Sequence, residues 1–254
     1  MIDAPNRAGD VPSSLMLIAL SRPGVLQLCR LACALPRASI LVGERHLDLI
    51  EGLENPAEGI EGGLGARVPA LMSGFDQLVF FLSVGAVVRL IAPHLRSKHR
   101  DPGVLAVDAG ARFVVPLVSG HIGGANAFAE RVAGMLGATA VITTASEAVE
   151  TIAVDILGRE LGWRVEAPEI NLRRAAASVV DGEPVVLIQE TGARDWWRGP
   201  GPLPDNICVR SALDGLDLDR FRAVLLVTGR RIPADLRQRL GERLVVYRPE
   251  GHRT

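Results

Sequence analysis

The chain has 254 residues, enough for one large or two small domains, and 48% of them are apolar, which is sufficient for a hydrophobic core. Its 28 basic and 29 acidic side chains give a net charge of −1, which argues against nucleic-acid binding through a strongly basic face. The sequence contains no run of 18 apolar residues, so it predicts no membrane-spanning helix. Residues 1–14 lack the pattern of a signal peptide, and we expect them to form a disordered tail. Three cysteines make no disulfide framework, which favours the reducing cytoplasm.

Short apolar runs alternate with helical patterns through residues 15–148. The sequence predicts strands over residues 15–20, 39–42, 77–82, 104–107, 112–117 and 139–143. It predicts helices over residues 25–35, 68–75, 84 to just before Pro93, and 127–136, with a loop over residues 43–65. Asp108-Ala109-Gly110 indicates a hairpin between two of the strands. The alternation predicts a three-layer, Rossmann-like α/β domain with a mixed, mainly parallel sheet.

The remaining residues, 149–254, predict a second, smaller α/β domain. Helical patterns cover residues 151–161 and 172–180. Strand patterns cover residues 184–188, 207–209, 223–228 and 244–247, and residues 191–204 are rich in Gly, Pro, Arg and Trp, as is typical of a loop.

The most site-like stretch has the sequence SGHIGGAN over residues 119–126, between an apolar strand and a helix. His121 can act as a general base, since imidazole titrates near neutral pH, or it can simply hydrogen-bond the loop. Ser119 is better suited to donate to a substrate or cap the helix than to act as a nucleophile, because nothing secures a base beside it. Gly120 and Asn126 stand in the same turn.

The glycines of this turn also indicate an anion site. Gly123 and Gly124 precede a helix, and backbone N–H groups at a helix N-terminus attract anions. The pattern is neither G-x-G-x-x-G nor a Walker motif, which argues against a nucleotide site. No group of His, Cys, Asp and Glu has the spacing of a metal site.

Two other turns follow predicted strands. In the first, Arg89, one helical turn after Gly85, can hold a carboxylate or can be a surface residue, and Lys98 in the next loop has the same two interpretations. In the second of these turns, Thr143 and Thr144 stand at the end of the strand predicted over residues 139–143.

Thr144 and Glu147 have the spacing of a capping box, although Glu147 can also act as an acid or base. Because ligands of α/β sheets collect at the carboxyl ends of strands, we expect all three turns there, with His121 and Arg89 facing one cleft.

Five blocks of sequence, in one order, resemble segments of the cobalamin biosynthesis family CbiG, the cobalt-precorrin 5A hydrolases. They are SVGAVVRLIAP at 83–93, KHRDPGV at 98–104, DAGARF at 108–113, SGHIGGAN at 119–126 and VITTAS at 141–146. Gly110 comes one place early, and Ser146 replaces the usual Thr. Beyond residues 153–155 the match weakens, and residues 190–225 are hard to place. The resemblance covers the N-terminal and central domains of the family, and we expect its C-terminal domain to be absent.

The resemblance implies hydrolysis of the δ-lactone of cobalt-precorrin 5A, with release of acetaldehyde to give cobalt-precorrin 5B. It implies no cofactor, and cobalt enters only as part of the substrate. His121 would be the base, with Glu147 as the next candidate, and the N–H groups of Gly123 and Gly124 would stabilise the oxyanion. Arg89 and Lys98 would hold carboxylates. Further substrate contacts are expected at Gly85, Ser119, Gly120, Asn126, Thr143 and Thr144.

A second hypothesis is a non-catalytic tetrapyrrole-binding subunit. Such a protein would present a corrin intermediate to a separate C-terminal domain protein or to a methyltransferase of the same pathway. Corrinoid binding without turnover would distinguish it from the hydrolase.

Overall fold

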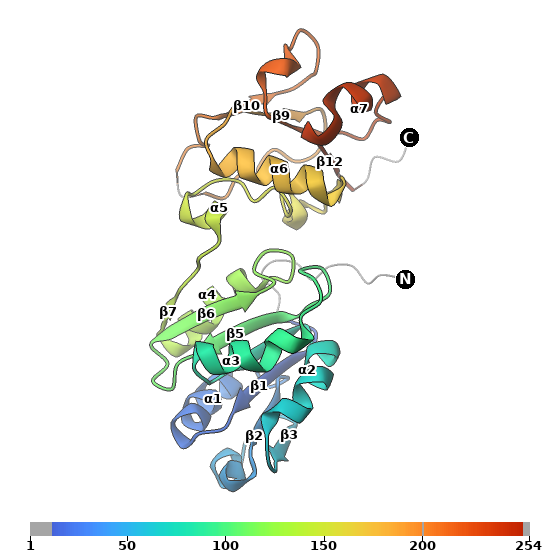
Figure 1. Ribbon diagram of the computed structural model, residues 1–254. Helices are drawn as coiled ribbons and strands as arrows, with labels where there is room; N and C mark the ends of the chain where they lie inside the picture. The colour runs from blue at the N-terminus through green and yellow to red at the C-terminus, as the bar shows by residue number, and fades with distance from the viewer. Residues whose placement is uncertain (1–11, 200, 251–254) are drawn as a thin grey trace. The chain divides into compact units, whose positions relative to one another are not determined.

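The structure is a computed structural model that describes residues 12–199 and 201–250. The chain divides between Ile142 and Thr143 into two compact units, each built around its own sheet (Figure 1). Most of the expected N-terminal tail lies outside the described residues. The last residue of that tail, Ser14, is among the described residues, and its backbone N–H donates to the Asp76 carboxylate over 3.0 Å.

The sheet of the first unit has seven strands in the order β3-β2-β1-β4-β5-β6-β7. They are β1 (Leu15–Ala19), β2 (Ser39–Gly43), β3 (Ala57–Ile60), β4 (Gln77–Phe80), β5 (Gly103–Val107), β6 (Phe113–Val118) and β7 (Thr139–Ala140). Strands β1 to β5 are parallel, whereas β6 runs antiparallel to β5, and β7 runs parallel to β6. The predicted mixed, mainly parallel sheet and its hairpin are confirmed.

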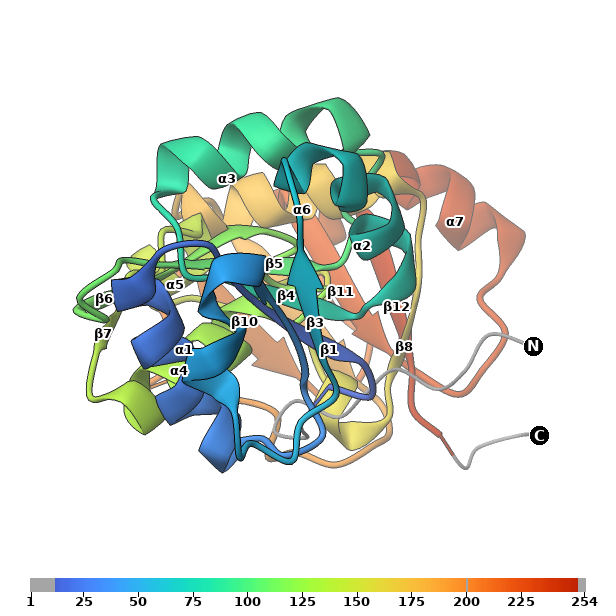
Figure 2. The same cartoon turned by 90° about the horizontal axis from the view of Figure 1, so that it is seen from below.

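Helices cover both faces of this sheet, which makes three layers (Figure 2). Alternate residues of the buried strands pack on α1 (Arg22–Ala34) and α4 (Ala125–Leu136) on one face. The residues between them pack on α2 (Val68–Gly74) and α3 (Val84–Ile91) on the other. This two-sided burial explains why the strands are continuously apolar. As expected, α3 ends before Pro93.

The second unit contains a five-stranded sheet in the order β10-β9-β11-β12-β8. Its strands are β8 (Arg164–Glu166), β9 (Val185–Gln189), β10 (Ile207–Arg210), β11 (Ala223–Val227) and β12 (Leu244–Arg248). All are parallel except β8, which pairs antiparallel with β12. Helix α6 (Glu169–Val180) packs on one face and α7 (Ala234–Leu240) on the other. The short helix α5 (Ala145–Ala148) precedes this sheet in the chain. None of the helices described in either unit is long and apolar enough to cross a membrane.

The predicted helix over residues 151–161 is wrong. Apart from a 3₁₀ turn at Arg159–Leu161, the segment is irregular, although Ile152, Val154 and Leu157 are buried as an apolar helix face would be. The carbonyl of Val154 accepts a 2.7 Å hydrogen bond from the hydroxyl of Tyr247, which takes an acceptor that a helix would use. A contact between residues 93 positions apart therefore overrides the local pattern.

Smaller departures occur at marginal elements. The loop predicted over residues 43–65 contains a 3₁₀ helix at Glu44–Ile50 and the edge strand β3, whose four residues, AEGI, are too few and too mixed to give a strand signal. The strand predicted over residues 139–143 pairs only at Thr139–Ala140. Strand β8 and helix α7 lie in stretches for which the sequence predicted no element.

Candidate functional site

The turn over residues 119–126 is tightly folded on itself. Ser119 has a left-handed backbone with φ of 58°, an uncommon conformation for a residue with a side chain. Its hydroxyl donates to the carbonyl of Asp101 over 2.8 Å, and its own carbonyl accepts from Ala125 over 3.2 Å. The Asn126 N–H donates to Gly120 over 3.0 Å. These bonds place the half-buried His121 at the apex of a constrained loop.

Two glycines of this turn are required for its close packing. A Cβ at Gly123 would lie 2.4 Å from the Cβ of Ser119, and one at Gly120 would lie 2.6 Å from Oδ1 of Asn126. The N–H of Gly124 donates to the carbonyl of His121 over 3.0 Å. That N–H is therefore committed to the turn, which corrects the expectation that both glycines serve as oxyanion donors.

Gln77 also belongs to this site, and sequence reasoning missed it. This first residue of β4 is only 5% exposed, and its Nε2 donates to the Gly123 carbonyl over 2.5 Å. Its Oε1 is buried without a hydrogen-bond partner among the described residues, so the amide is held for its contact with the turn at some cost. A Cβ at Gly103 would lie 2.1 Å from Oε1, so the start of β5 leaves room for this amide. The available signal was a polar residue opening a buried apolar strand.

The direction of β6 corrects the expectation of one shared cleft. Because β6 is antiparallel to β5, its last residue Val118 pairs with Val104 near the start of β5. The turn that follows β6 therefore lies at the amino edge of the parallel strands, beside Gln77. Ser83 follows the carboxyl end of β4, at the opposite edge of the sheet. The expectation that His121 and Arg89 face one cleft is not supported by this arrangement.

Arg89 and Lys98 occupy different edges. The Nη1 of Arg89 donates to the Gly85 carbonyl over 3.0 Å, which folds this exposed side chain back along α3 toward the carboxyl edge. Lys98 is exposed in the loop that leads from α3 to the amino end of β5. The same loop contains Asp101, whose carbonyl binds the Ser119 hydroxyl. The structure thus brings the Lys98 loop, but not Arg89, to the turn that carries His121.

The remaining predicted residues belong to the second unit. Thr144 is the N-cap of α5, but its side chain makes no capping bond to the helix and donates instead to the carboxylate of Glu147. Ser146 donates to the same carboxylate over 3.0 Å. Thr143 and Glu147 are exposed. Glu147 is therefore tied to neighbouring hydroxyls of its own helical turn.

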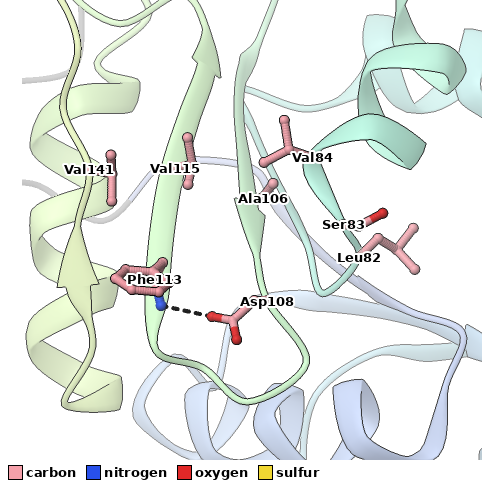
Figure 3. A pocket seen from close by; sticks show the side chains of 8 residues that line it. All are labelled: Leu82, Ser83, Val84, Ala106, Asp108, Phe113, Val115 and Val141. Atoms are coloured by element: carbon pink, nitrogen blue, oxygen red, sulfur yellow. Dashed lines mark hydrogen bonds between the residues drawn. The ribbon is translucent and has the colours of Figure 1, made fainter.

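An apolar hollow opens on the α3 side of the seven-stranded sheet (Figure 3). Its volume is about 350 Å³. Residues from four strand regions, those of β4, β5, β6 and β7, and from the start of α3 line it, namely Leu82, Ser83, Val84, Ala106, Asp108, Phe113, Val115 and Val141. Ser83 and Asp108 are its polar members, and both follow the carboxyl ends of parallel strands, β4 and β5. The sequence predicted a ligand-binding turn after the strand over residues 77–82, but it could not show this hollow, because the other walls come from segments far apart in the chain.

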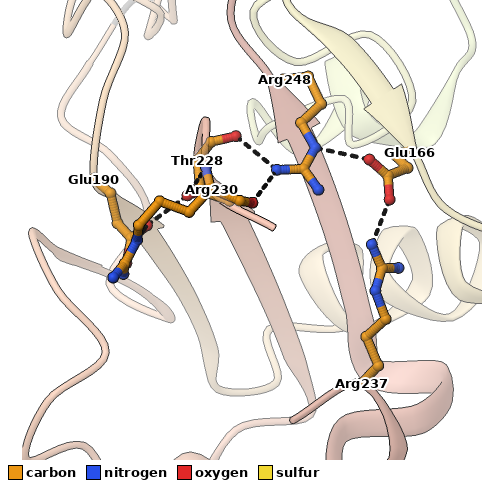
Figure 4. Close-up of polar contacts among 6 residues, drawn as sticks. All are labelled: Glu166, Glu190, Thr228, Arg230, Arg237 and Arg248. Atoms are coloured by element: carbon orange, nitrogen blue, oxygen red, sulfur yellow. Dashed lines mark hydrogen bonds and ion pairs between the residues drawn. The ribbon is translucent and has the colours of Figure 1, made fainter. Parts of the chain in front are cut away.

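The carboxyl edge of the five-stranded sheet is filled by polar contacts (Figure 4). Thr228, 1% exposed, follows β11 and donates its hydroxyl to Glu190, which follows β9. Arg230 pairs with Glu190 through two nitrogens. Burial alone would raise the pKa of Glu190, but the hydrogen bonds from Arg230 and Thr228 hold that pKa below its ordinary value.

A second carboxylate joins this edge to β8. Glu166 accepts from Arg248 over 2.7 Å and also from Arg237. The hydrogen bond from Arg248, more than that from Arg237, lowers the pKa of Glu166 against the effect of burial. The guanidinium of Arg248 also donates to the Thr228 carbonyl over 3.1 Å. The two carboxylates are thus linked into one network, which fastens the strand ends of this sheet.

Comparison with known proteins places both units in one family. Residues 67–147 match the family described as cobalamin synthesis G N-terminal, and residues 152–249 match the cobalamin biosynthesis central region. A cobalt-precorrin-5A hydrolase from Priestia megaterium is 38% identical over 197 residues, which is 78% of this chain and 52% of that protein. One from Salmonella typhimurium is 34% identical over 186 residues, 73% of this chain and 49% of that protein.

The chain thus spans about half the length of the curated relatives it matches. A solved structure from Sulfolobus solfataricus, titled as a cobalamin biosynthesis protein G homolog, aligns over 93% of this chain and 60% of its own. Its identity is 19% and its TM-score 0.46, so it adds nothing to the assignment. The two matched regions and the two relatives agree with one another. The chain belongs to the CbiG cobalamin-biosynthesis family, of which it contains the N-terminal and central regions.

Proposed function

We propose that this protein is a cobalt-precorrin-5A hydrolase that acts in the cytoplasm. The observation that carries the proposal is the turn over residues 119–126, which packs His121 and Gly123 into one constrained loop within the region that matches the family. Relatives named cobalt-precorrin-5A hydrolase, at 34–38% identity, support the substrate. A tight glycine turn with a titratable imidazole suits hydrolysis of an ester, which requires a base for water and a donor for the oxyanion.

In this proposal His121 removes a proton from the water that adds to the lactone carbonyl carbon. The Gly123 N–H stabilises the negative oxygen of the resulting tetrahedral intermediate. Collapse breaks the ring ester to a carboxylate and an alkoxide. The C–C bond between the alkoxide carbon and the ring carbon then breaks. The alkoxide carbon leaves with its methyl group as acetaldehyde, and the ring carbon keeps the electron pair of that bond and takes a proton. Lys98 attracts a peripheral carboxylate of the substrate to the amino edge of the sheet.

Gln77 holds the turn in position in this scheme. Its hydrogen bond to the Gly123 carbonyl orients the peptide groups on either side of that residue. Oxyanion donors are effective only when their direction is set before the reaction, so a buried side chain that restrains the turn would contribute through orientation. Glu147 is the alternative base if His121 is not.

A second candidate is a non-catalytic subunit that binds the corrinoid and presents it to a separate C-terminal domain protein or a methyltransferase. Two observations favour it. The Gly124 N–H is engaged within the turn, and His121 and Arg89 lie toward opposite edges of the sheet, so fewer catalytic groups converge than the sequence suggested.

Acetaldehyde release separates the two functions. The purified chain would be incubated with cobalt-precorrin 5A, alone and with a separately expressed C-terminal region of a full-length relative. Acetaldehyde in either reaction supports the hydrolase. Its absence from both, together with a shift of the corrinoid absorbance on mixing, would establish the binding subunit instead.

A further inference from the structure

The hollow beside α3 has the size and chemistry of a site for part of a larger ligand. Its volume of about 350 Å³ lies at the lower end of the roughly 300–1,000 Å³ typical of small-molecule sites. Its walls are mainly apolar, and two of them, Val84 and Phe113, are 42% and 43% exposed. The exposed parts of these two side chains lie side by side with the buried walls, which leaves apolar surface at the hollow available to a ligand. The space suits one edge of a macrocycle better than a whole one.

The rim of the hollow attracts negative charge. Ser83 and Val84 line it, and they are the N-cap and first residue of α3, where the helix has a partial positive charge. The Ser83 side chain makes no capping bond to the helix. In the same first turn, a Cβ at Gly85 would lie 3.3 Å from Nη1 of Arg89, so the missing side chain leaves room for that guanidinium.

The one carboxylate in the lining, that of Asp108, is bonded to donors of its own hairpin. Asp108 accepts from the backbone N–H groups of Arg112 and Phe113, each over 2.8 Å, and from that of Gly110 over 3.2 Å. The Arg112 side chain adds an ion pair at 3.3 Å. Asp108 therefore caps the hairpin, and the Arg112 guanidinium offsets part of its negative charge.

We propose that this hollow binds an apolar edge of the corrinoid substrate, with a peripheral carboxylate held at the start of α3. This subsite rests on the proposed function, and it lies away from the turn that carries His121. The substrate would then be held along β6. Phe113 at the hollow and Ser119 at the turn are six residues apart, which in a strand is about 20 Å. A macrocycle with extended carboxylate arms spans a distance of this order.

Two substitutions separate the apolar and charged parts of this subsite. Val84→Trp fills the hollow from its exposed rim, and Val88→Trp is the matched control, because Val88 is 44% exposed one turn along α3 and is not a lining residue. Ser83→Asp places a carboxylate at the rim while remaining a favoured N-cap, so the helix is retained. Binding would be titrated by absorbance with cobyrinic acid, whose arms end in carboxylates, and with cobinamide, in which amides replace them. Circular dichroism would verify folding.

We expect Val84→Trp to weaken binding of both corrinoids by about tenfold or more, and Val88→Trp to change it less than about twofold. We expect Ser83→Asp to weaken cobyrinic acid by a similar factor and cobinamide little. Equal affinities for the two tryptophan variants, or no binding of cobyrinic acid to the unaltered chain, would overturn the proposal. If Val84→Trp fails to fold, Ser83→Asp alone decides it, since equal effects on both corrinoids would contradict a carboxylate at the rim.

The acetaldehyde assay keeps the two proposals distinguishable. Acetaldehyde release together with unchanged binding by Val84→Trp leaves the hydrolase intact and removes this subsite. The expected binding pattern without acetaldehyde leaves the subsite intact and removes the hydrolase.

Discussion

The two sheets of this chain end their parallel strands in different ways. At the carboxyl edge of the seven-stranded sheet, an apolar hollow remains beside the start of α3. At the carboxyl edge of the five-stranded sheet, Glu190, Thr228 and Arg230 are bonded to one another. Both edges are places where α/β proteins commonly bind ligands. The difference shows that the side chains after each strand, and not the sheet alone, decide whether such an edge can receive a ligand.

This comparison assigns different tasks to the two units. The first unit contains the constrained turn with His121 and the hollow, so changes there should alter ligand binding or turnover. The second unit has a carboxyl edge satisfied by its own ion pairs, so changes there should alter stability.

Replacing His121 should produce the largest effect. His121→Ala should lower kcat by roughly 10²–10⁴-fold with little change in substrate binding, because it removes proton transfer. Arg89→Ala should instead weaken binding, by about 1.5–3 kcal/mol, through loss of a charge-assisted hydrogen bond. Steady-state acetaldehyde release and absorbance titrations measure the two quantities. Full turnover by His121→Ala would transfer the role of base to Glu147, and unfolding would show that this histidine is structural.

Gly123→Ala should disrupt the turn itself. The new Cβ would meet Ser119 at 2.4 Å, so the loop must shift at a cost of about 1–3 kcal/mol, and turnover should fall with it. Gly134→Ala is the control, since that glycine lies within α4 with open space around it, and alanine should stabilise the helix by about 0.5–1 kcal/mol. Denaturant unfolding and activity would be measured on both. Normal turnover by Gly123→Ala would contradict a role for the tight turn.

Glu190→Ala should destabilise the second unit without directly removing a group of the proposed site. It takes the acceptor from the buried Thr228 hydroxyl, so the free energy of unfolding should fall by about 1–3 kcal/mol. Asp195→Ala breaks the exposed pair with Arg198 and should cost less than about 0.5 kcal/mol. Hydrogen exchange would locate the loss. Equal stability of the two variants would mean that the polar edge is not a structural fastening.

The smallest effect is a pH dependence of the same edge. Glu166 and Glu190 have pKa values below the ordinary 4.5 in the folded chain. Their stabilisation is therefore complete above that value and is lost as pH falls through it toward the folded pKa values. Denaturant unfolding between pH 7 and pH 3 should show this loss, and Glu190→Gln should show less of it. Identical pH profiles for the two proteins would remove Glu190 from the account.

Much of the first unit follows from local patterns. The strand, glycine turn and helix around residues 113–136 were recognisable because their apolar periods and turn residues are contiguous. The hairpin at Asp108-Ala109-Gly110 also implied that β6 is antiparallel. An antiparallel β6 places the turn over residues 119–126 at the amino edge of the sheet. The hairpin signal could therefore have predicted that His121 and Arg89 lie at different edges.

The α/β class, the family and the glycine turn that carries His121 could be predicted from the amino-acid sequence, because these features depend on residues close together in the chain. The contact of Gln77 with Gly123, 46 positions later, and the hydrogen bond from Tyr247 to Val154 in place of a helix became visible only in the folded chain. The hollow beside α3 also depends on long-range contacts, since its walls meet only when the strands are arranged in the sheet. Such contacts depend on strand order and direction, and short-range periodicity contains no information about which distant residues will meet.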